Sequence, residues 1–234
     1  MLGMFIYRIQ PVNLLPQSIR AAYMSGTVEQ KQVIRYFFKQ RTTFDIFCDI
    51  FNKRMISDRS YDVLIQNYLN KIDFKKRALD KFGMDEEEFI EVTPIKFENY
   101  IFNGEKILWK GGNDGKGRSS TYQISWLFGT SEKLYFYSYI FYTDKNLKNE
   151  TAEEFFWKDI VKISDSNSLV EIHRIASWDY RTGKTISEEK RSIDIHQLTI
   201  VVPGDQIECV IDENNDTKRA IRGLKTKLEE KKKT

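Results

Sequence analysis

A long aromatic hairpin between residues 119 and 142 constrains the fold of this chain more than any other feature of its sequence. Apolar and small polar side chains alternate along its first half, with the apolar positions at Tyr122, Ile124, Trp126 and Phe128. A period of two is typical of a half-buried β-strand. Turn residues follow at Gly129–Glu132, and a second aromatic strand runs to Tyr142. Because a single hairpin is not stable in water, these two strands predict a larger antiparallel sheet.

The spacing of apolar residues changes near Pro94. Before this residue, apolar side chains recur at helical spacing, and after it they recur with the period of a strand. A chain of 234 residues is long enough for one large domain or two small ones. We therefore expect an α+β fold with a helical region over residues 1–94 and a β-rich region over residues 95–234.

The first region carries several signals for helix starts and ends. They are a capping box at Thr27 and Gln30, an apolar stripe over residues 44–54, N-caps at Ser60 and Asp73, and a C-terminal glycine at Gly83. Apolar stripes at helical spacing usually pack in a core. We interpret these helices as a packing layer rather than as the walls of a ligand pocket.

The second region predicts about seven antiparallel strands followed by one helix. Besides the hairpin, strand structure is expected to begin over residues 97–102 and continue over residues 106–110, and further strands are expected over residues 155–163, 169–178, 193–202 and 207–211. Residues 111–118 are expected to form a flexible loop, and residues 143–151 a polar connection. The last helix begins at Asp212 or Asn214 and has one apolar stripe. Such strands can bend into a partly open barrel or sandwich whose open end the helix covers.

Composition and motifs give no support for nucleic-acid binding or catalysis. The chain has 37 basic and 34 acidic residues and a net charge of +3, so no overall attraction to nucleic acid is expected. No nucleophile, phosphate-loop or metalloprotease motif is present, so we predict a non-enzymatic protein with no catalytic residue and no cofactor. A composite site built from distant residues is the alternative.

Metal binding, disulfides and membrane spans are not expected either. Cys48 and Cys209 lie far apart in apolar patterns and are expected to be free thiols. The only histidines are His173 and His196, so a zinc site would need all four residues to converge. No apolar run approaches the ~18 residues of a membrane span, and we expect a cytoplasmic location.

Two segments of the β-rich region resemble bacterial pleckstrin-homology-like domains. In Leu127–Ser138, a strand, a Thr-Ser turn, a basic residue and an aromatic strand follow one another. Phe156–Ile163 contains the pattern aromatic-x-Asp-Ile-x-x-Ile. The resemblance covers about residues 95–232 and implies a pleckstrin-homology-like barrel or sandwich with a C-terminal capping helix. Such domains bind lipids, peptides or proteins, so the resemblance implies a bacterial binding or scaffold protein.

A glycine-rich loop provides a candidate phosphate site. Lys110, Lys116 and Arg118 have the order Lys-x5-Lys-x-Arg, which is similar to the phosphoinositide-binding signature of pleckstrin-homology domains. Backbone N–H groups near glycines can approach a phosphate, and the three cations can neutralise it. The alternative is a solvated turn, which Asp114 within the loop favours.

The second hairpin strand carries a candidate protein interface on one face. Its residues are Tyr135, Tyr137, Tyr139 and Phe141. We expect the helical region to cover part of this face and a protein partner, or a second copy of the chain, to bind the rest. Protein binding through this face or an open sheet edge is the function that we favour. Binding of a phosphate ligand or an anionic membrane surface through the glycine-rich loop is the alternative.

Overall fold

The computed structural model describes residues 15–38, 56–88, 92–104, 107–112, 114–179, 182 and 184–233. The helices are α1 (Gln17–Ser25), α2 (Val28–Phe38), α4 (Asp58–Asn70), α5 (Phe74–Phe82) and α6 (Asn215–Lys233), with 3₁₀ helices η2 (Glu86–Glu88) and η3 (Trp157–Asp159). The strands are β1 (Val92–Tyr100), β2 (Trp109–Gly111), β3 (Gly117–Ser119), β4 (Thr121–Gly129), β5 (Lys133–Tyr142), β6 (Lys148–Phe156), β7 (Lys162–Trp178), β8 (Thr185–Val202) and β9 (Asp205–Val210).

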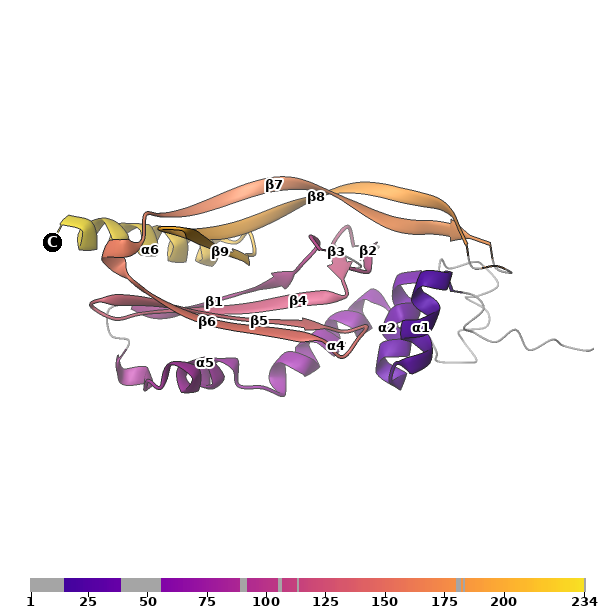
Figure 1. Cartoon of the computed structure of the whole chain (residues 1–234), viewed down its shortest axis with the longest axis horizontal. Coiled ribbons are helices and arrows are strands. Elements are labelled where there is room, and N and C mark those ends of the chain that lie inside the picture. The colour runs from indigo at the N-terminus through magenta and orange to yellow at the C-terminus, as the bar shows by residue number, and fades with distance from the viewer. Residues whose placement is uncertain are drawn as a thin grey trace, which may run out of the picture.

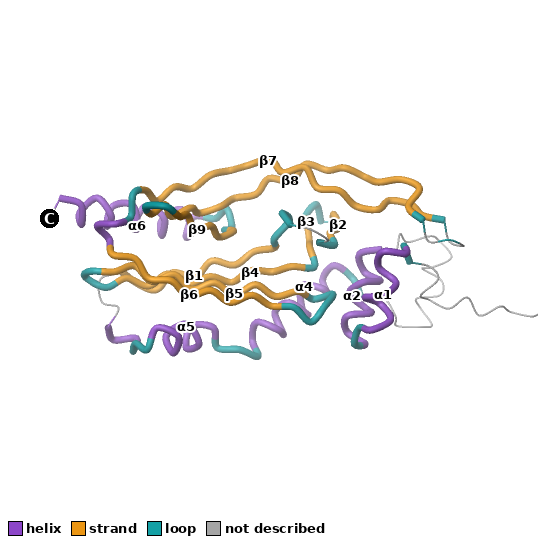
Figure 2. Tube along the Cα trace, viewed as in Figure 1, coloured by secondary structure: helices purple, strands orange, loops and turns teal. Residues whose placement is uncertain are grey.

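The described elements form three layers, and the middle layer is an antiparallel sheet. This sheet has the order β1-β4-β5-β6, and a second sheet has the order β7-β8-β9. Figure 1 shows α4 and α5 along one face of the central sheet and β7–β9 with α6 along the other face. The short β2–β3 pair lies under the long β7–β8 hairpin, as the trace in Figure 2 also shows. The expectation of a mixed fold with antiparallel sheets and a C-terminal helix is therefore confirmed.

The central sheet separates two apolar cores. On its helical face, Tyr122, Ile124 and Phe128 pack in one cluster with side chains of α1, α2, α4 and α5. On its other face, Leu127 and Phe136 pack with side chains of β7–β9 and α6. The predicted hairpin is therefore the β4–β5 pair, and it contributes to both cores.

The polar face of β4 differs from the prediction of a half-buried strand. Gln123 is buried, and its Oε1 accepts a hydrogen bond from the Val210 N–H at 3.0 Å while its Nε2 donates to Ser138 Oγ at 2.8 Å. Ser125 is fully buried on the same face. Buried polar groups are stable when they are hydrogen-bonded. The small polar residues of β4 therefore mark the contact between two sheets and not a solvated surface.

The helix signals were largely correct. The capping box is formed, because the Thr27 N–H donates to Gln30 Oε1 and the Gln30 N–H donates to Thr27 Oγ1. Asp73 caps α5, which ends at Gly83 with a left-handed φ of 64°. The N-cap of α4 is Ser57 and not Ser60, because Ser57 Oγ accepts from the N–H of Ser60. The predicted stripe over residues 44–54 lies outside the described residues.

Two strand predictions in the β-rich region were wrong. The expected polar connection over residues 143–151 contains the start of β6, an edge strand whose charged side chains hide its strand character. The expected strand over residues 155–163 is interrupted by η3. The Trp157 backbone N–H donates to the Glu132 carbonyl, and its Nε1 donates to the Thr130 carbonyl. These bonds fix the chain against the β4–β5 turn, which favours a tight turn over an extended strand.

The described sheets are not closed into a barrel, since the central sheet ends at β1 and β6 and the second sheet is hydrogen-bonded separately. Helix α6 supplies Ile221, Leu224 and Leu228 to the core between them. Asn214 is its cap, because Asn214 Oδ1 accepts from the Thr217 N–H at 2.8 Å. The predicted covering helix is therefore present over two separate sheets.

A substitution at Gly129 tests the tight contact between β1, β4 and η3. A Cβ at Gly129 would lie 2.6 Å from Val92 Cγ2 and 3.2 Å from Trp157 Cζ2. We expect Gly129→Ala to lower the free energy of unfolding by about 1–3 kcal/mol, measured by urea denaturation. The matched control is Gly223→Ala in α6, where a Cβ meets nothing within 4 Å and the unfolding free energy should rise by up to about 1 kcal/mol. Equal effects of the two variants would contradict this packing.

Glu150 provides a pH test of the contact between α5 and the central sheet. Arg77 donates two hydrogen bonds of 2.7 Å to its carboxylate, and Tyr137 donates a third of 2.8 Å. The bonds from Arg77 are the largest cause that lowers the pKa of Glu150 from 4.5 to about 2. A lowered folded-state pKa stabilises the protein above the unfolded-state value, and this stability is lost as the pH falls towards about 2.

We therefore expect wild type to be more stable than Glu150→Gln at neutral pH. The difference in unfolding free energy should narrow as the pH falls below about 4.5, measured by urea unfolding at each pH. A difference that stays constant over this range would show that the carboxylate charge does not stabilise the contact.

Candidate functional site

A groove lies between β1 and α6 on the described residues. It has a volume of about 710 Å³. One wall is the first part of β1, from Val92 to Phe97, and the other is the side of α6 that carries Thr217, Ala220 and Gly223. The groove therefore runs between one strand and one helix, and Ala220 and Gly223 give the helical wall two small residues.

The β1 wall is an open edge of the central sheet. Among the described strands, β1 pairs with β4 alone, from Val92 opposite Gly129 to Tyr100 opposite Tyr122. The pairing shifts register between Val92 and Ile95, and Pro94 in this interval has no N–H to donate. An edge strand has backbone donors and acceptors directed away from its sheet. The edge that can accept a further strand therefore begins at Ile95.

The α6 wall is open at Gly223, which is an exposed position of the helix. A Cβ added there would meet no heavy atom within 4 Å, although the residue lies in the interior of a long helix. Glycine at such a position costs about 1 kcal/mol of helix stability relative to alanine. Ile221 and Leu224 hold the helix on the core, and the Asn99 Nδ2 donates to the Ile211 carbonyl at 3.1 Å beside its start. The opening at Gly223 therefore lies in a helix whose position is fixed.

The charges of the groove are paired within its own walls. The pairs are Lys96 with Glu98 at 3.0 Å, Arg219 with Asp216 at 3.4 Å and Lys227 with Glu230 at 3.6 Å. Each charged residue that lines the groove has an opposite charge on the same strand or helix. The groove therefore has no strong field of either sign.

A smaller cavity of about 260 Å³ lies between the two sheets. Thr121, Gln123, Tyr142 and Val210 are among the residues that line it. The Oγ1 of Thr121 is buried and has no hydrogen-bond partner among the described residues. A cavity beside an unpaired hydroxyl can hold a water molecule.

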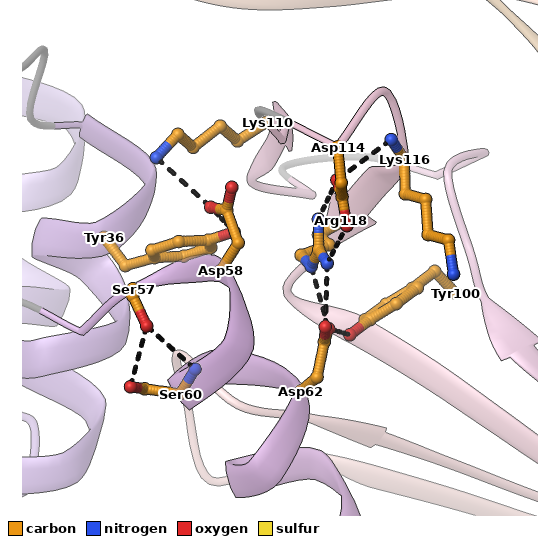
Figure 3. A network of polar contacts seen from close by, with 10 residues as sticks. All are labelled: Tyr36, Ser57, Asp58, Ser60, Asp62, Tyr100, Lys110, Asp114, Lys116 and Arg118. Atoms are coloured by element: carbon orange, nitrogen blue, oxygen red, sulfur yellow. Dashed lines mark hydrogen bonds and ion pairs between the residues drawn. The ribbon is translucent and has the colours of Figure 1, made fainter.

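The candidate phosphate residues lie at the junction of the sheet with the helical layer. Figure 3 shows Arg118 between Asp114 and Asp62. Arg118 is 2% exposed, and its guanidinium donates to both oxygens of Asp62, at 2.8 and 2.7 Å, and to both oxygens of Asp114, at 2.9 and 2.8 Å. The hydrogen bonds from Arg118 hold the pKa of Asp114 well below its usual range. Arg118 is therefore fully used in joining β3 to α4.

The two candidate lysines have different surroundings. Lys110 Nζ lies 3.7 Å from Asp58 Oδ1 and 4.5 Å from the centre of the Tyr36 ring. Lys116 is exposed, and its backbone N–H donates to Asp114 Oδ1 at 3.1 Å. The segment is also more ordered than the predicted flexible loop, because β2 and β3 pair from Trp109 opposite Ser119 to Gly111 opposite Gly117. Lys110 and Arg118 are thus paired with the carboxylates of Asp58, Asp62 and Asp114, whereas Lys116 contributes only its backbone N–H to Asp114 (Figure 3).

The candidate interface aromatics lie on the helical face of the central sheet. Tyr135, Tyr137, Tyr139 and Phe141 are 7%, 0%, 2% and 1% exposed. Phe141 stacks on Tyr68 of α4 with ring centres 4.0 Å apart, and burial raises the pKa of Tyr137 and Tyr139. The helical layer, which we expected to cover part of this face, covers all four residues.

The remaining reactive groups of the described residues are enclosed or paired, and Cys48 lies outside the described residues. Burial raises the pKa of the Cys209 thiol to about 12, which disfavours the reactive thiolate. His173 Nε2 lies 3.1 Å from Glu171, and His196 Nε2 lies 3.2 Å from Glu213. No group of three or more His, Cys, Asp or Glu side chains suited to a metal ion occurs among the described residues. Within the same part of the chain, each helix is too short or too polar to cross a membrane.

Sequence reasoning missed the groove, although two signals for it were present. Pro94 lies just before the first predicted strand, and a proline beside a strand is typical of a sheet edge or a bulge. Gly223 within the predicted last helix indicates a place where a side chain is excluded or unnecessary. Neither signal shows by itself that β1 and α6 face each other, because that depends on the packing of segments more than a hundred residues apart.

Comparisons with known proteins found no match: no protein-family model, no curated protein and no solved structure is significantly similar to this chain.

The different roles of Arg118 and Lys116 can be measured by substitution. We expect Arg118→Gln to lower the free energy of unfolding by about 2–3 kcal/mol, less than for a fully enclosed ion pair because both carboxylates reach solvent. Lys116→Gln, at an exposed position of the same segment, should change it by less than about 0.5 kcal/mol. Urea unfolding of both variants checks this prediction. Similar small effects would mean that the Arg118 contacts do not hold the layers together.

Proposed function

We propose that this protein is a non-enzymatic binding module that takes a protein partner along the groove between β1 and α6. The β-rich region serves as a pleckstrin-homology-like scaffold for that groove. Support for this scaffold comes from the antiparallel β4–β5 hairpin in Leu127–Ser138 and from the helix α6 that covers the core. Its two sheets remain separate, which leaves β1 as an edge.

One observation carries the proposal: the open edge of β1 and helix α6 lie on opposite sides of the same groove. Either feature alone is common in folded proteins, and a lone edge is usually protected against association. Here Gly223 leaves space beside the edge at a cost to its own helix. Such a groove can enclose a partner segment from two sides, by the strand and by the helix.

The position of the charges favours this groove over the glycine-rich segment. A phosphate ligand bound by Arg118 would have to displace Asp62 and Asp114, which already occupy its donors. The groove requires no such rearrangement, because its charges are paired along its own walls. A protein partner in the groove is therefore the function that the geometry supports best.

Two substitutions at one residue test the function. Gly223→Ala adds a methyl group and leaves the groove open, whereas Gly223→Leu fills it from a position with free space. A photo-reactive amino acid is placed at Thr226, which lines the groove, or at Arg222, which is exposed on α6 outside the groove. Irradiation of cells of the source organism then labels whatever protein lies against each position.

We expect a discrete cross-linked protein from Thr226 and none of the same mass from Arg222. The product should persist in Gly223→Ala and fall at least about tenfold in Gly223→Leu, with both variants folded by circular dichroism. A second copy of the chain as the cross-linked protein would identify self-association as the form of binding. Equal cross-linking from both positions, or a product that Gly223→Leu leaves unchanged, would contradict the proposed function.

A further inference from the structure

We infer that the occupant of the groove is an extended, uncharged peptide segment that adds as a further strand to β1, beginning at Ile95. This inference rests on the proposed function and specifies the chemistry of its partner. It follows from the backbone of β1, the shape of the α6 wall and the charges of both walls.

The backbone of β1 selects an extended partner. Its edge presents alternating N–H and carbonyl groups, and only another extended chain has the same spacing of donors and acceptors. A helical partner satisfies its own backbone groups and would leave the edge unpaired. Because Pro94 has no N–H and the register shifts at this point, the added strand pairs from Ile95 onward. It ends before Tyr100, whose N–H donates to Asn99 Oδ1 at 2.8 Å.

The α6 wall selects a side chain on the added strand. Ile95 and Phe97 lie on the face of β1 that packs towards α6, in the same cluster as Leu224. Every second side chain of an added strand points to this face. The open space at Gly223 accommodates one of them, and Ala220 lies one turn before it on the same wall. The partner therefore carries an apolar side chain at alternating positions.

The charges of the groove select an uncharged segment. Each charged residue lining the walls already has an opposite charge within 4 Å. An added charge would gain no unpaired partner there and would lose hydration. Binding is therefore expected to depend little on salt, in contrast to a charged ligand held by surface lysines.

The test begins with phage-displayed random dodecapeptides. Peptides are selected on the wild-type protein, and those that also bind Gly223→Leu are removed. The selected peptides are synthesised in two N-methylated forms, with every second amide methylated in one form and the intervening amides in the other. Only one set of amides faces β1 in an added strand, and the other set faces solvent. Affinities are measured by fluorescence anisotropy between about 0.1 M and about 1 M salt, over which the Debye length falls from about 10 to about 3 Å.

We expect selected peptides to have alternating apolar positions and little net charge. One N-methylated form should bind at least about tenfold more weakly, and the other within about threefold of the parent peptide. Raising the salt concentration should change the affinity by less than about threefold. Loss of affinity in only one form is the signature of strand addition, since the two forms differ by one methyl group at most.

Other results separate the two proposals. Peptides that need an open Gly223 but tolerate both methylations, or that bind only at low salt, would overturn strand addition and leave the groove as a binding site. Selection that yields no peptide sensitive to Gly223→Leu, together with no cross-link from Thr226, would overturn the proposed function itself. Peptides that bind as helices, shown by circular dichroism of the complex, would also overturn the strand mode.

Discussion

Burial of the β4–β5 hairpin on both faces is the constraint on which the rest of the structure depends. Large aromatic side chains on one face require a helical layer, and the apolar residues on the other require a second sheet and α6. Neither covering layer is complete without the hairpin, because each packs its own apolar stripe against it. The molecule is therefore organised outwards from two strands, and the ion pairs at its layer boundaries act on surfaces that the hairpin defines.

The fold was predictable where a local pattern determines local structure. The capping box at Thr27, the cap at Asp73 and the left-handed Gly83 follow from the chemistry of neighbouring residues, and each is present. The strand β6 was not predictable in the same way. Edge strands carry charged side chains that resemble those of loops, and their pairing partner is set by the sheet and not by their own residues. The 3₁₀ turn at Trp157 was missed for a related reason, since it depends on carbonyl groups of the β4–β5 turn.

For the candidate site, too, the sequence shows which residues are present but not which distant residues contact them. The basic residues of the glycine-rich segment were visible in the sequence, but the carboxylates that occupy two of them come from α4, some fifty residues earlier. Charges that look available in a linear motif can be committed to the packing of layers. The aromatic face of β5 is a second case, because its residues look equally suited to a partner and to a core. Only the position of α4 and α5 distinguishes these alternatives.

The hydrogen bond from the Tyr61 hydroxyl to the Ser119 carbonyl, at 2.7 Å, has a consequence for biosynthesis. Tyr61 is fully buried, yet the backbone group and the aromatic strands that enclose it are made only after more than fifty further residues have been joined to the chain. The helices that precede the hairpin are therefore synthesised before the sheet face against which they pack. The core that these helices share with the hairpin is therefore completed only after Tyr142 has been synthesised. Contacts with chaperones should accordingly concentrate on the nascent helical segments and end when the aromatic hairpin closes over them.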